Sequence, residues 1–131
     1  MEPTLIDKQT VEYLPSTGTM PSPGDIIIFS GVGRYRGDLT KRVIAVAGQD
    51  LQIDYENQTI TVDGKLMDES GYVQGYLAEG DIPVEQLNGI VPEGKLFVLG
   101  DNRTISLDSR HYAIGLVDVS NIIGTVIIPE K

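Results

Sequence analysis

The chain has 131 residues, of which 40% are hydrophobic and 22% are charged, which is the composition of a globular domain with its own core. The formal net charge of −9 argues against nucleic acid as a partner, because phosphate binding needs a basic surface. Cysteine is absent and histidine occurs once, which excludes thiol catalysis, disulfides and a multi-histidine metal site within one chain, so no metal or cofactor is expected.

Short runs of β-branched and apolar residues, separated by turn residues, predict strands along most of the chain. In chain order, strands are expected at residues 10–14, 26–29, 41–47, 51–55, 59–62, 65–67, 95–99, 113–117 and 121–128. Tight turns at residues 56–58 and 63–64 join three of these strands into a β-meander. We therefore predict a single all-β domain over residues 1–131, made mostly of antiparallel sheets.

Residues 68–93 interrupt this regular strand pattern. The segment is acidic and rich in glycine, and its hydrophobic residues follow neither a helical nor a strand period clearly. One helical turn is expected at residues 83–87. We predict that the segment is a small insertion within the domain.

The segment with the most unusual composition is residues 100–110, Gly-Asp-Asn-Arg-Thr-Ile-Ser-Leu-Asp-Ser-Arg, which directly follows an apolar strand. Asp101 and Arg103, and again Asp108 and Arg110, stand two residues apart. Composition alone favours a solvated loop with local ion pairs. The alternative is a braced turn that holds neighbouring groups still for chemistry.

Lys41 begins a run of β-branched residues and could therefore lie partly buried in a strand. Burial disfavours the charged ammonium and lowers the pKa of a lysine, which can turn it into a base near neutral pH. Taken alone, an exposed lysine on an edge strand is the simpler interpretation.

Four segments, in order, resemble the sequence boxes of the type I signal peptidases, a family of serine–lysine endopeptidases. They are residues 1–4 (Met-Glu-Pro-Thr, without the serine that begins the family's Ser-Met-x-Pro-Thr box), 24–29 (Gly-Asp-Ile-Ile-Ile-Phe), 41–44 (Lys-Arg-Val-Ile) and 100–110. The last box matches at every fixed position, and the resemblance spans essentially the whole chain. It implies a signal-peptidase-like catalytic core of antiparallel sheets.

The resemblance also implies roles for individual residues. Lys41 is expected to be the general base, and Ser106 to orient its amine without adding a charge, since a carboxylate there would raise the lysine pKa. The nucleophilic serine would directly precede Met1, so the 131 residues by themselves are expected to be inactive. The residues expected to support the site are Arg42, Asp101, Asn102, Arg103, Asp108 and Arg110. Those expected to bind substrate are Met1, Pro3 and Ile28. His111 is expected on the surface, without a catalytic role.

The function implied is removal of signal peptides from exported pre-proteins at the extracytoplasmic face of the cell membrane, with an anchoring N-terminal helix that is not in this sequence. One alternative is a catalytically inactive relative that binds pre-proteins or assists pilus assembly. Another is a serine–lysine autoprotease like the LexA-type repressors, which lack the box at residues 100–110. The presence of Lys41 and Ser106 disfavours the inactive relative, and the residue encoded before Met1 would decide between it and the peptidase.

Overall fold

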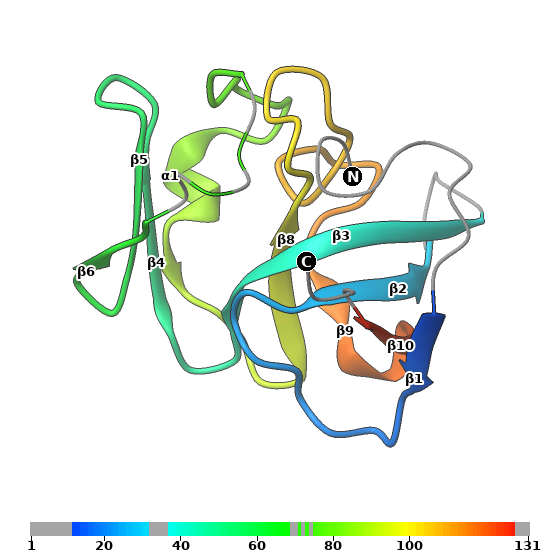
Figure 1. Cartoon of the computed structure of the whole chain (residues 1–131). Coiled ribbons are helices and arrows are strands. Elements are labelled where there is room, and N and C mark those ends of the chain that lie inside the picture. Colours follow the sequence, from blue (N-terminus) through cyan, green and yellow to red (C-terminus); the bar gives the residue numbers. More distant parts are fainter. Residues whose placement is uncertain (1–11, 32–36, 69–70, 72, 74, 128–131) are drawn as a thin grey trace.

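The computed structural model describes residues 12–31, 37–68, 71, 73 and 75–127 (Figure 1). Within this part of the chain, the strands form two sheets in which every pair is antiparallel, and the helical structure amounts to one short α-helix and one 3₁₀ turn. The prediction of an all-β fold with mostly antiparallel sheets is therefore confirmed. No helix in the described residues is long and apolar enough to span a membrane.

The larger sheet has six strands, and its middle is formed by the most apolar runs of the sequence. Their order is β1 (Glu12–Pro15), β10 (Ile122–Ile127), β2 (Ile26–Ser30), β3 (Asp38–Val46), β8 (Lys95–Leu99) and β9 (Val117–Asp118). A 3₁₀ turn, η1 (Val119–Asn121), joins the last strand in this order to β10. The strand predicted at residues 113–117 is wrong for all but its last residue. Instead, His111 O accepts hydrogen bonds from the backbone N–H groups of Ile114 and Gly115, which closes a local turn.

The smaller sheet contains the predicted meander and lies to the left of the larger sheet in Figure 1. Its order is β6 (Lys65–Leu66), β5 (Thr59–Val62), β4 (Asp50–Asp54) and β7 (Gly89–Ile90). Gln58 and Asp63 adopt positive φ angles of 58° and 53° at the two turns. The helical turn predicted in the insertion is present as α1 (Val84–Leu87).

The strands β3 and β8 lie between two hydrophobic clusters, so both of their faces are covered. Ile44, Phe97 and Leu99 belong to the cluster under the smaller sheet. Val43 and Val98, which point the opposite way, belong to the second cluster. Successive side chains of a strand alternate between faces, so burial at both faces accounts for the continuous apolar runs. Burial at both faces also means that Lys41 and Arg42, two polar residues of β3, are buried.

The insertion at residues 68–93 adds to the same core. Its strand β7 pairs with β4, and its residues Leu77 and Val91 are buried in the cluster that contains Ile44. The surrounding stretch from 47 to 94 carries ten of the nineteen acidic residues and only one of the ten basic residues. The net negative charge of the chain is thus concentrated in and around the smaller sheet.

Candidate active site

Lys41 lies in the middle of the larger sheet, where β3 pairs with β2 on one side and β8 on the other. Only 9% of the residue is exposed, and its Nζ donates a hydrogen bond to Ser106 Oγ at 2.9 Å. Burial lowers the pKa of Lys41 below the ordinary 10.5, and this effect exceeds the opposing attraction of the Asp108 carboxylate. Burial therefore favours the neutral form of the Lys41 amine more than water does, and the interpretation as an exposed edge residue is wrong.

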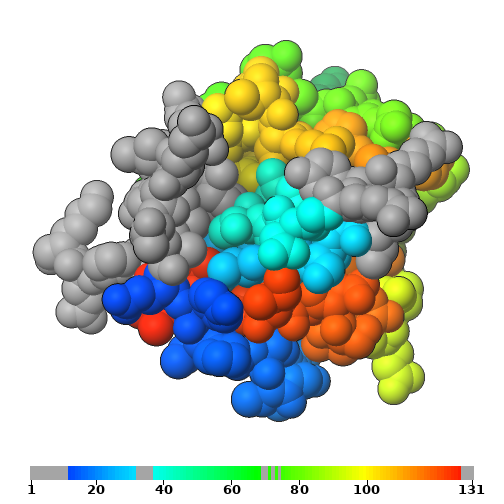
Figure 2. Space-filling model, turned by 90° about the vertical axis from the view of Figure 1, so that its right-hand side faces the viewer, coloured from blue at the N-terminus to red at the C-terminus, as the bar shows by residue number. Residues whose placement is uncertain are grey.

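Ser106 reaches the lysine because the loop of residues 100–110, called the site loop below, turns back after β8. The carbonyl of Asn102 accepts hydrogen bonds from the backbone N–H of Ile105 at 3.3 Å and of Ser106 at 3.0 Å. Gly100 leaves the room that this turn needs, since a side chain there would collide with the Ser106 side chain and would approach Lys41 Nζ to 3.3 Å. In Figure 2 the yellow residues of the site loop lie against the cyan beginning of β3.

Asp108 and Arg110 form the brace that the spacing predicts, and both are almost completely buried. Arg110 Nε and Nη2 donate to the two carboxylate oxygens of Asp108, each at 2.8 Å. The remaining guanidinium hydrogen bonds go to the carbonyl oxygens of Ala78 at 2.6 Å, Arg103 at 2.9 Å and Ser106 at 3.3 Å. Arg110 thus uses all five of its N–H donors, most of them within the site loop.

Asp101 forms the second buried ion pair, with a partner that its sequence neighbours do not indicate. Its two carboxylate oxygens accept hydrogen bonds from Arg42 Nε and Nη2, both at 2.9 Å. Arg42 Nη1 also donates to Gly24 O at 2.9 Å. Since Arg42 follows Lys41 in β3, this bidentate pair ties the start of the site loop to the strand that carries the lysine.

The other residues predicted for the site lie around this centre. Arg103 is 2% exposed and donates from Nε to Gly100 O at 2.7 Å. Ile28 is half-buried in β2, next to Ile27, which pairs with Lys41. Met1 and Pro3 lie outside the described residues.

His111 lies at the surface, as expected, but it also contacts the brace. Its side chain is 26% exposed and its Nδ1 lies 3.8 Å from Asp108 Oδ1. The same nitrogen accepts a hydrogen bond from the Asp108 backbone N–H at 3.4 Å. The imidazole thus packs on the outer side of the brace.

Two features of the site loop were missed from the sequence. Ser109 is buried and pairs with Val98 of β8 through its side chain at 3.0 Å and its backbone N–H at 3.1 Å. The insertion also contacts the loop, because Tyr76 and Ala78 bond Thr104 and Arg110. Neither contact follows a local pattern, and glycines at 75 and 80 were the only sequence signal for close backbone approach.

A buried lysine that bonds a serine hydroxyl, held in an antiparallel β-fold by two buried ion pairs, is a site suited to proton transfer in peptide hydrolysis. The family model of signal peptidase, peptidase S26, matches residues 1–130. The chain belongs to this family, and its resemblance to the type I signal peptidases is confirmed.

Named relatives support the same assignment. The chain is 35% identical to signal peptidase IB of Staphylococcus aureus (strain COL), over 96% of this chain and 70% of that protein. It is 40% identical to signal peptidase I of Bacillus caldolyticus, over 78% of this chain and 57% of that protein. The crystal structure of a signal peptidase I from Enterococcus faecalis V583 has a TM-score of 0.62 and 28% identity, covering 83% of this chain and 98% of that one. Signal peptide removal is thus the activity that the family supports.

Proposed function

We propose that this protein is a signal peptidase that cleaves pre-proteins by a serine–lysine mechanism, with Lys41 as the general base. The observation that carries the proposal is the 2.9 Å hydrogen bond from the buried Lys41 Nζ to Ser106 Oγ. A neutral amine that donates to Ser106 has its position fixed and keeps its lone pair for a second hydroxyl. Because Ser106 is uncharged, it orients the amine without favouring the ammonium.

The nucleophile in this proposal is the serine that the family's first box places directly before Met1. Lys41 would take the proton from that hydroxyl as its oxygen bonds the scissile carbonyl carbon. The resulting ammonium would give the proton to the departing amine as the C–N bond breaks. The neutral Lys41 amine would then take a proton from a water molecule as that water bonds the acyl carbon of the ester. The proton would pass to the serine oxygen as the ester C–O bond breaks, which releases the signal peptide and restores the serine.

The arginine partners of Asp108 and Asp101 limit how far these two carboxylates can raise the pKa of Lys41. Asp108 and Asp101 both raise the pKa of Lys41, whereas Arg110 lowers it. Each carboxylate is held by both oxygens on an arginine, at 2.8 Å and 2.9 Å, and the positive charge of Arg110 opposes the effect of Asp108 on Lys41. Burial then remains the largest influence on the lysine pKa.

We also propose that the enzyme works at the extracytoplasmic face of the cell membrane, held there by a segment that is not in this sequence. Apolar side chains of β1 and β10 support a position against a bilayer, since Tyr13, Leu14 and Ile127 are 44%, 62% and 43% exposed. The acidic smaller sheet is a separate part of the chain. Outside residues 47–94 the chain has nine acidic and nine basic residues, so the excess negative charge does not belong to this edge.

The direct test is to compare three proteins on a pre-protein with an Ala-x-Ala cleavage site. They are the 131 residues alone, the same chain with serine directly before Met1, and the chain with alanine at that position. Only the form with serine is expected to release the mature protein, detected by the change in mass. Equal cleavage by the alanine form would contradict the proposed nucleophile, and no cleavage by the serine form would favour an inactive relative.

The pH dependence of cleavage should report the state of Lys41. Because the neutral amine is the base and burial lowers its pKa, kcat/KM of the serine-bearing form should rise with pH and level off below 10.5. The measurement is kcat/KM for a peptide without ionisable side chains near the cleavage site. A rate that does not change with pH, or a rise that begins only near 10.5, would contradict the assignment of the base.

A further inference from the structure

Residues 75–82 of the insertion lie against the site loop and are called the brace segment here. This segment is distinct from the brace that Asp108 and Arg110 form within the site loop. The Tyr76 backbone N–H donates to Thr104 Oγ1 at 3.1 Å, and this hydroxyl donates to Tyr76 O at 3.3 Å. The Ala78 carbonyl accepts from Arg110 Nη1 at 2.6 Å. The segment thus contacts the site loop both just before Ser106 and at the arginine that follows it.

A third contact lies at the end of the brace segment. The Ile82 backbone N–H donates to Arg110 O at 3.0 Å. Gly80 passes so close to Arg110 that a side chain at this position would collide with the arginine backbone. Backbone packing without room for a side chain leaves little freedom for one segment to slide along the other.

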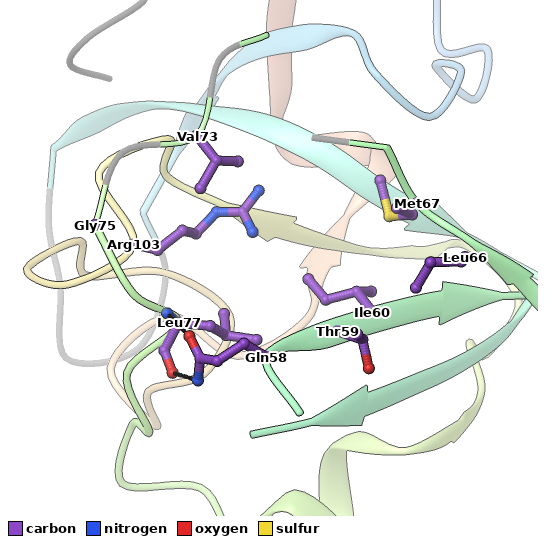
Figure 3. Close-up of a pocket in the computed structure, with 9 residues that line it drawn as sticks. All are labelled: Gln58, Thr59, Ile60, Leu66, Met67, Val73, Gly75, Leu77 and Arg103. Carbon is purple, nitrogen blue, oxygen red and sulfur yellow. Dashed lines mark hydrogen bonds between the residues drawn. The ribbon is translucent and has the colours of Figure 1, made fainter. Parts of the chain in front are cut away.

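The brace segment is itself held by a side chain from the turn that joins β4 and β5 of the smaller sheet. Gln58 Oε1 accepts from the Leu77 backbone N–H at 2.6 Å, and its Nε2 donates to Leu77 O at 3.0 Å and Tyr55 O at 2.8 Å. Figure 3 shows the carboxamide of Gln58 facing the backbone of Leu77, beside a pocket of about 450 Å³. The carboxamide therefore bonds both backbone groups of Leu77, as the backbone of a neighbouring strand would do.

The backbone at Gln58 is strained, because its φ angle of 58° is one that residues other than glycine rarely adopt. Glycine adopts this conformation freely and is the usual residue at such a turn. Glycine at this position would relieve the strain but could not make the hydrogen bonds that the Gln58 carboxamide makes. Strain of this kind is often found where a side chain has a functional task.

We propose that Gln58 is a positioning residue for the Lys41–Ser106 pair. Its carboxamide holds Leu77, the next residue presents its carbonyl to Arg110, and Arg110 in turn bonds the Ser106 carbonyl at 3.3 Å. The smaller sheet thus helps to set where the Ser106 hydroxyl meets the lysine amine. This inference rests on the proposed function, because it assigns Gln58 to the same catalytic pair.

The kinetic test uses the serine-bearing form with Gln58→Gly and Gln58→Leu. We expect kcat to fall about tenfold to a hundredfold, as for a small misplacement of a catalytic group. The KM should change less than about twofold, because a positioning residue acts on the chemical step rather than on substrate binding. The matched control is Gln52→Leu on β4, whose side chain donates to Asp50 of the same strand, and it should keep the parent kcat.

Thermal unfolding separates positioning from general destabilisation. Gln58→Gly loses the carboxamide contacts but relieves the backbone strain, so we expect its melting temperature to stay near that of the parent while kcat falls. Gln58→Leu keeps the strain and should be less stable. Losses of kcat that follow the melting temperatures of the two variants would overturn the proposal, and so would a parent-like kcat in Gln58→Gly.

A second readout does not depend on cleavage. The chain has five lysines, and the signal of Lys41 can be assigned in the NMR spectrum of the 131 residues by its loss in Lys41→Arg. We expect the pKa of Lys41 to move toward 10.5 in Gln58→Gly, because a looser site loop admits water to the amine, and to stay unchanged in Gln52→Leu. An unchanged titration in both variants would overturn the role of Gln58. A parent that fails to cleave would instead overturn the proposed function, and the titration would still decide the role of Gln58.

Discussion

Replacing Lys41 with methionine should reduce cleavage by the serine-bearing form by about 10²- to 10⁴-fold, the range that a general base contributes. Methionine fills similar space without an ionisable group, so the fold should persist. The measurement is kcat/KM on a pre-protein substrate. The control is Lys65→Met, on the exposed edge strand β6, which should cleave like the parent. Activity of Lys41→Met within a few-fold of the parent would show that another group is the base.

The same substitution should change the pH dependence of stability. The pKa of Lys41 is lower in the folded chain than the 10.5 of an unfolded one, so the unfolded state binds more protons between these two values. The parent should therefore gain stability as pH rises through this window, and Lys41→Met should not. We expect the methionine variant to be the more stable protein at neutral pH, with an advantage that shrinks toward pH 10.5. Denaturant unfolding at a series of pH values measures this difference.

Replacing Arg110 with methionine should cost about 3–5 kcal/mol of unfolding free energy, because it leaves the carboxylate of Asp108 buried without its partner. The site loop would also lose the hydrogen bonds to Ala78 and Ser106, so activity should fall with stability. Urea unfolding monitored by circular dichroism gives the free energy.

The matched control for this buried pair is the exposed ion pair between Lys95 and Asp118. Its side chains are each 39% exposed, and Lys95→Met should cost far less unfolding free energy than Arg110→Met. If Arg110→Met and Lys95→Met had similar costs, the Asp108–Arg110 pair could not be the buried brace that the structure describes.

Much of the fold could be predicted from the sequence, because strand patterns are local. The alternating run at residues 51–55 and the turn at Asp63 and Gly64 identified the meander directly. The strand predicted at residues 113–117 was wrong because an apolar run does not show whether its backbone groups have a neighbouring strand or bond within a turn.

The candidate site could be predicted only in part. The spacing of Asp108 and Arg110 indicated their ion pair, since residues so close in the chain cannot be far apart. The partner of Asp101 is Arg42, 59 residues earlier, and spacing carries no information over that distance. The assignment of Lys41 and Ser106 to one site came from the family resemblance, and the structure places their side chains 2.9 Å apart.

Local features of the chain, namely its apolar periodicity, its turn residues and its short boxes, were enough for the all-β class, the family and the residue types of the site. The state of the lysine depended on the tertiary structure, because a pKa is set by what surrounds the group rather than by its neighbours in the chain. Lys41 is buried because β3 is covered on both faces, and the site loop is held by a brace segment that begins 25 residues before it. Packing between distant segments thus decided whether these residues form a site, since burial and hydrogen-bond geometry exist only once those segments meet.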